Sequence, residues 1–110
     1  MTELEQVISG SGVGSNLWRL LEQLGIKHDP ECSCILLALL MNELGPEGCR
    51  QNAPHLLKLM RKNQKRFGWG TRIRAASRIV SNGMVFSINP LAPLKSLLGI
   101  AIKQTEQQSG

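Results

Sequence analysis

The sequence predicts an all-α fold, a small bundle of four to five short helices with one short extended segment. Apolar residues recur at helical spacing in several stretches, and glycine or proline separates these stretches. The chain has 110 residues, the usual size of a single domain, and its 42% hydrophobic and 19% charged residues are typical of a folded protein. Residues 1–14 are expected to be a flexible leader, 15–106 a single helical domain and 107–110 a tail.

A first helix is expected at about residues 16–24, with Ser15 or Asn16 as its N-cap. The glycine-rich run at 10–14 could cradle a phosphate at the start of this helix. Because the run lacks the lysine and hydroxyl residue of a phosphate-binding loop, a flexible leader is the favoured interpretation. The inward side of the helix is expected to consist of Leu17, Leu20, Leu21 and Leu24.

The stretch at residues 35–44 is apolar on almost every side, so this helix is expected to be central and the most buried element. Leu40→Ala is then expected to cost about 2–5 kcal/mol of stability. Gly45-Pro46 should end the helix, and a short turn is expected at 47–52.

The second half of the chain is expected to contain a helix at about 53–66, a fourth helix at about 72–82 and a last amphipathic helix at about 93–106. Residues 84–88 are β-prone and bounded by turn residues, which predicts an extended segment. The apolar side of the helix at 53–66 is Leu56, Leu57, Met60 and Phe67, and that of the last helix is Leu94, Leu97, Leu98, Ala101 and Ile102.

Charge is distributed unevenly along the chain. Residues 1–49 carry seven acidic side chains and a net charge of −5, whereas residues 50–105 carry eleven basic side chains and no acidic one. The basic half should present positive potential wherever it faces water. Candidate partners are therefore nucleic acid, an anionic membrane or an acidic protein surface, including the acidic half of a second copy.

Four of these cations form a basic stripe, which we define as Lys58, Arg61, Lys62 and Lys65, at i, i+3, i+4 and i+7 of one helix. Repeated cations on one surface suit phosphate groups, and a neighbouring aromatic ring can stack on an exposed base. The alternative is a solvated helix face whose aromatic neighbours are in the core. The stripe is expected to be exposed and clustered with Arg74 and Arg78. The expected contact residues are Lys58, Arg61, Lys62, Lys65, Arg66, Trp69, Arg72, Arg74 and Arg78.

A set of short motifs runs through the first half of the chain. It consists of Gly12-Val13-Gly14, Leu24-Gly25-Ile26, Cys32-x-Cys34, Met41-Asn42, Gly45, Cys49 and Asn52. The set resembles a family of short proteins and C-terminal segments from bacteriophages and planctomycete-like bacteria, some of them fused to glycosyltransferases. This chain departs from the family pattern at Ser15-Asn16, where the family has Thr-Glu, and at Gly48, where it has tryptophan. The resemblance covers residues 12–60 and implies no assigned activity.

The three cysteines are odd in number and no basic N-terminal region marks a secretion signal, so reduced thiols are expected. A structural zinc site is the alternative. A straight helix would carry Cys49 about 15 Å from Cys34, so Cys49 is not expected to join such a site. The favoured interpretation is buried cysteines with no metal and no cofactor. If a metal is present, the expected ligands are His28, Cys32, Cys34 and His55.

No catalytic residues are predicted, because the chain has no tyrosine, one aspartate and no paired carboxylates at a spacing suited to acid–base chemistry. The longest apolar run, Ile35–Met41, is seven residues and too short to span a membrane. The sequence therefore predicts a non-catalytic, cytoplasmic or virion-associated protein that binds a macromolecule. Nucleic-acid contact through the basic helices is the leading interpretation. The alternative is a phage-type structural or adaptor protein that binds an acidic protein surface.

Overall fold

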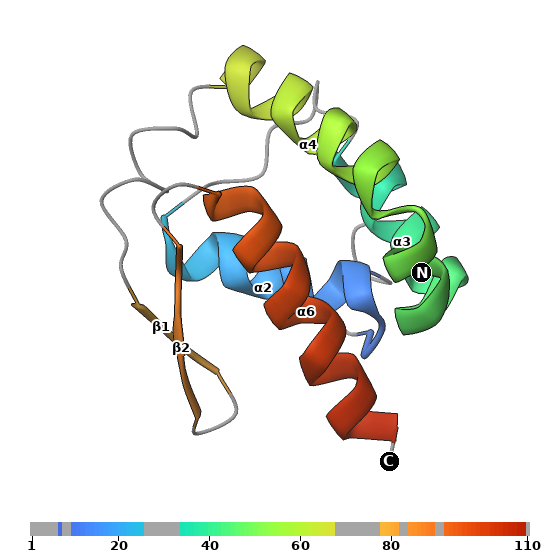
Figure 1. Ribbon diagram of the computed structural model, residues 1–110, viewed down its shortest axis with the longest axis vertical. Coiled ribbons are helices and arrows are strands. Elements are labelled where there is room, and N and C mark those ends of the chain that lie inside the picture. Colours follow the sequence, from blue (N-terminus) through green and yellow to red (C-terminus); the bar gives the residue numbers. More distant parts are fainter. Residues whose placement is uncertain are drawn as a thin grey trace.

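The computed structural model describes residues 7, 10–25, 34–67, 78–81, 84–89 and 92–109. Most of these residues are helical, which confirms the predicted fold class. The elements are α2 (Val13–Gln23), α3 (Cys34–Gln51), α4 (Ala53–Phe67), β1 (Arg78–Ser81), β2 (Met84–Ser87) and α6 (Pro93–Ser109). Figure 1 shows α6 beside α2, with α3 and α4 on one side of this pair and the β1–β2 hairpin on the other.

The core is centred on α2 and α6. All five residues predicted to lie on the inward side of α6 are buried, and so are Leu17, Leu20 and Leu21 of α2. The amphipathic spacing of these helices therefore predicted their buried sides correctly. α4 contributes Leu56, Leu57 and Met60 to the same core.

α3 is not the most buried element, so that prediction is wrong. Met41 is buried, but Leu36 is 60% exposed and Leu40 is 40% exposed. Burial requires a neighbour on every side of a helix, and among the described elements α3 packs against α2, α4 and α6, which do not surround it. The large cost predicted for Leu40→Ala does not follow for a side chain this exposed.

The chain bends sharply within α3 at Gly45. This glycine has a φ of 72°, a left-handed conformation that glycine adopts without the steric cost of a Cβ. Helical conformation resumes at Pro46, whose fixed φ suits the first turn of a helix. Gly45-Pro46 thus interrupts the helix as predicted, but residues 47–51 are helical where a turn was expected.

The hairpin corrects another prediction, since residues 78–81 are strand β1 and not the end of a helix at 72–82. β1 pairs antiparallel with β2, with Ile79 opposite Phe86 and Val80 opposite Val85. The β-branched residues of this stretch fit a strand at least as well as a helix. Strand β2 confirms the extended segment predicted at 84–88, while residues 72–77 lie outside the described residues.

α2 begins at Val13, earlier than expected, and its first turn packs directly on α3. A Cβ added to Gly14 would lie 1.8 Å from the backbone oxygen of Ala38, so this glycine allows the two helices to approach closely. Asn42 of α3 bonds Ser15 twice: its Oδ1 accepts from the Ser15 backbone N–H at 3.0 Å, and its Nδ2 donates to the Ser15 hydroxyl at 3.0 Å. The start of α2 is therefore filled by α3 and is not an open phosphate cradle.

The expected leader ends too late in the sequence, because its last two residues, Val13 and Gly14, are buried residues of α2. Likewise, α6 extends to Ser109, into the residues expected to form a tail. The rest of the predicted division into leader, domain and tail is untested. Within the described ranges, no helix combines the length and apolar character needed to cross a membrane.

Candidate nucleic-acid interface

α4 has one buried side and one cationic side. Its buried residues anchor the helix in the core, while Lys58, Arg61 and Lys62 are exposed on the side away from it. These three cations lie within about 6 Å of one another along the helix axis, since each residue adds about 1.5 Å. We call Lys58, Arg61 and Lys62 the cationic side of α4.

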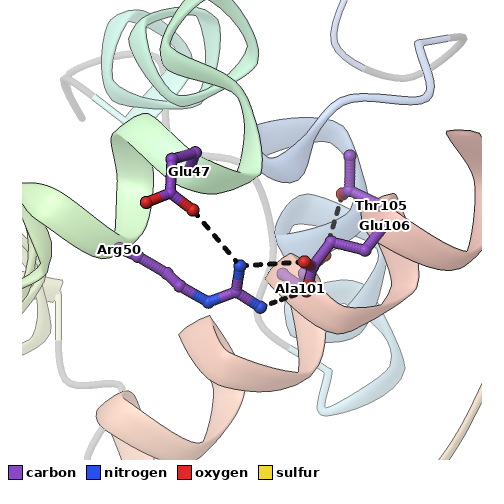
Figure 2. A network of polar contacts seen from close by, with 5 residues as sticks. All are labelled: Glu47, Arg50, Ala101, Thr105 and Glu106. Carbon is purple, nitrogen blue, oxygen red and sulfur yellow. Dashed lines mark hydrogen bonds and ion pairs between the residues drawn. The ribbon is translucent and has the colours of Figure 1, made fainter.

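The cationic side has no acidic neighbour on its own helix, because residues 53–67 contain no aspartate or glutamate. The ion pairs formed among the described residues do not involve it. They belong to Arg50, which lies 3.7 Å from Glu47 and forms a two-pronged contact with Glu106 of α6 (Figure 2). Within the described part of the chain, no acidic side chain is thus paired with the cationic side of α4.

The Arg50–Glu106 pair itself neutralises the cation that precedes α4. Hydrogen bonding to Arg50 lowers the pKa of the Glu106 carboxyl, and the same bonds raise the pKa of Arg50. Both side chains are substantially exposed, so the pair is screened by water and salt. It joins the end of α3 to α6 and leaves Arg50 less suited to hold an external anion.

The structure places the other expected contact residues less closely together. Lys65 and Arg66 are residues of α4, but their side chains are not among those described. Arg78 is exposed on β1, which lies on the other side of α6 from α4 (Figure 1), so it does not join the cationic side. The remaining expected contact residues lie outside the described residues and are Trp69, Arg72 and Arg74.

Cys49 is buried in the core and is poorly suited to metal binding or nucleophilic attack. Its Sγ lies 3.5 Å from the backbone oxygen of Met41, to which it donates. Burial raises the pKa of this thiol to about 11, from an ordinary value of 9.0. The thiolate, which is the form that attacks or binds a metal, is therefore scarce at neutral pH.

The alternative metal site is untested. His55 is exposed on α4 and Cys34 begins α3, but His28 and Cys32 lie outside the described residues. Across the residues that the structure does describe, no three histidine, cysteine or acidic side chains are grouped as metal ligands.

A buried polar network between α2 and α6 was missed by the sequence analysis. Asn16 donates through Nδ2 to the Thr105 hydroxyl at 2.8 Å and accepts at Oδ1 from Arg19 at 2.7 Å. The Thr105 hydroxyl donates in turn to the backbone oxygen of Ala101 at 2.8 Å (Figure 2). Asn16, expected as an N-cap, instead fixes the register of two helices. The available signal was the position of Thr105 one turn after Ala101, on the inward side of α6.

No protein-family model matches this chain, and no curated protein or solved structure is significantly similar to it. The resemblance to the bacteriophage and planctomycete-like family is therefore still a prediction.

Proposed function

We propose that the protein binds nucleic acid through the cationic side of α4 and has no catalytic activity of its own. The observation that supports this most is the exposure of Lys58, Arg61 and Lys62 together on a helix without acidic residues. The ligand class is the phosphate backbone, which presents a regular row of negative charges to such a helix.

The buried side of α4 holds in place the helix that carries these cations. Leu56 and Met60 are completely or almost completely buried, so the helix is held firmly by the core. Binding then orders the long cationic side chains but not the backbone that carries them, which keeps the entropic cost low. Release of counterions from the nucleic acid supplies the favourable free energy.

The expected binding is independent of base sequence. Phosphate contacts position a protein on nucleic acid, whereas base-edge contacts provide sequence specificity. The cationic side consists of lysine and arginine on one exposed turn, which suits phosphate contacts. Stacking of a base on Trp69 is a further element of the proposal that the described residues leave untested.

Fluorescence anisotropy with labelled duplex and single-stranded DNA of arbitrary sequence tests the proposal. Lys58→Gln/Lys62→Gln should weaken duplex binding and flatten the dependence of log K on log salt by up to about 1.8, since each phosphate contact contributes about 0.9. The matched control is Lys95→Gln/Lys103→Gln, which removes two exposed lysines from α6. Equal losses in both double variants would show that net charge, and not the cationic side of α4, determines binding.

The same assay distinguishes the alternative of a phage-type structural or adaptor protein that binds an acidic protein surface. Polyglutamate is added as a competitor at the same concentration of negative charge as the DNA. Nucleic-acid binding predicts weak competition, because the dense charge of duplex DNA condenses counterions whose release favours binding. Competition as strong as that of unlabelled DNA would favour the acidic protein partner.

A further inference from the structure

One side of α3 is apolar and faces solvent. Leu36 is 60% exposed and Leu40 is 40% exposed, while Ala38 and Met41 on the opposite side of the helix are buried. Glu43 is also exposed and continues this side at i+7 from Leu36. We call Leu36, Leu40 and Glu43 the α3 face. Leucine is one of the residues most often buried, so two neighbouring exposed leucines mark a surface suited to a partner.

The α3 face borders an open groove of about 590 Å³. Both amide atoms of the lining residue Asn42 are hydrogen bonded to Ser15, and Glu43 is the charged residue among the described lining residues. A groove with so few available polar groups suits a leucine side chain better than a polar small molecule. The described lining residues are Leu36, Leu39, Leu40, Asn42 and Glu43.

We infer that the α3 face binds the α3 face of a second copy of this chain, with the two helices antiparallel. A two-fold dimer uses the same patch twice, so the patch must be complementary to itself. In the antiparallel arrangement, Leu40 of the α3 face lies opposite Leu39 of the second copy, a partly buried residue that lines the adjoining groove. The two-fold axis repeats this contact, so four leucines form the apolar centre of the interface. Each of them fits between side chains of the facing helix. Leu36 of each copy then lies opposite Glu43 of the other.

The charge of Glu43 determines the direction of the two helices. The antiparallel arrangement brings Glu43 to the N-terminal end of the second copy's α3, where the helix dipole is positive. The first turn of α3 contains no acidic residue. A parallel arrangement would instead bring two Glu43 carboxylates together, and they would repel each other. The second copy thus covers the exposed leucines and places the positive end of its helix dipole beside Glu43.

The size of the face predicts a weak dimer. From Leu36 to Glu43 the face extends about 10 Å along the helix, which is short compared with the interfaces of stable dimers. Association is therefore expected at micromolar or higher concentrations, in exchange with the monomer. This inference does not depend on nucleic-acid binding.

Sedimentation velocity of the full chain over a concentration series tests the inference. The average mass should rise from 12.1 kDa toward twice that value. Leu40→Gln should weaken the association by roughly tenfold or more, because it removes the apolar centre. Leu36→Gln is a second variant at an even more exposed position. The control is Val85→Gln, which changes a 62% exposed apolar residue on β2 and should not alter the association. Circular dichroism verifies that each variant is folded.

Two further variants test the antiparallel register. Leu36→Lys places a cation opposite Glu43 of the second copy, so it should associate roughly tenfold more tightly than Leu36→Glu. High salt should leave the wild-type dimer largely intact, whereas a pairing between the cationic side of α4 and the acidic half of a second copy would dissociate. The inference is overturned if the chain is monomeric at every concentration, if Val85→Gln acts like Leu40→Gln, if the two Leu36 charge variants behave alike, or if salt dissociates the dimer.

Discussion

Gly14→Ala tests the close crossing of α2 and α3. The added Cβ would lie 1.8 Å from the Ala38 oxygen, and because ordinary contacts begin near 3.4 Å the helices must separate by about 1.6 Å. Overpacking costs about 1–3 kcal/mol, and the separation breaks two hydrogen bonds between Ser15 and Asn42 that contribute about 1 kcal/mol each. Alanine recovers about 1 kcal/mol of helix propensity, so the expected net loss is about 2–4 kcal/mol.

Urea unfolding followed by circular dichroism measures this loss, and Gly99→Ala is the matched control. Gly99 is an exposed helical glycine of α6, and a Cβ there would meet nothing within 4 Å. The control should therefore gain about 0.5–1 kcal/mol of stability from helix propensity alone. If Gly14→Ala were as stable as Gly99→Ala, the two helices would not cross closely at Gly14 and the reasoning would fail.

Two other predictions concern buried groups. Burial raises the pKa of Cys49 to about 11 and favours the neutral thiol, so its contribution to stability is complete below about pH 9 and is lost as pH rises toward 11. The stability difference between wild type and Cys49→Ala should therefore shrink across this range in unfolding experiments, and parallel pH profiles would contradict the prediction. Gln104 is buried and its Nε2 has no hydrogen-bond partner among the residues that the structure describes, so Gln104→Met should raise the free energy of unfolding by about 1–2 kcal/mol. A measured loss would show that the amide is satisfied by water.

Local spacing was sufficient to predict α2, α4 and α6. In each helix the apolar side chains recur at about one-turn intervals, and a helix with one such side has one way to face the core. The same spacing predicted that Lys58, Arg61 and Lys62 would share a side of α4, and their exposure agrees with that prediction.

The local spacing of apolar residues did not predict structure that depends on neighbours distant in the sequence. The exposure of Leu36 depends on how many elements surround α3, which its own apolar sequence does not reveal. Strand β1 depends on pairing with β2, although the apolar residues at 73, 76 and 80 and the basic residues at 74 and 78 also recur at helical spacing. The dipeptide Asn82-Gly83 between the two strands is a common hairpin signal and was the available clue.

The contact between Asn16 and Thr105 also determines when the protein can fold during its synthesis. The two residues are 89 positions apart, and at about 5–20 residues per second α2 leaves the ribosome roughly 4–18 s before the end of α6 is made. During this interval the inward leucines of α2 lack the helix that buries them, and Asn16 lacks its hydroxyl partner. The nascent chain is therefore expected to expose an apolar helix to chaperones and to complete its fold only after α6 has emerged.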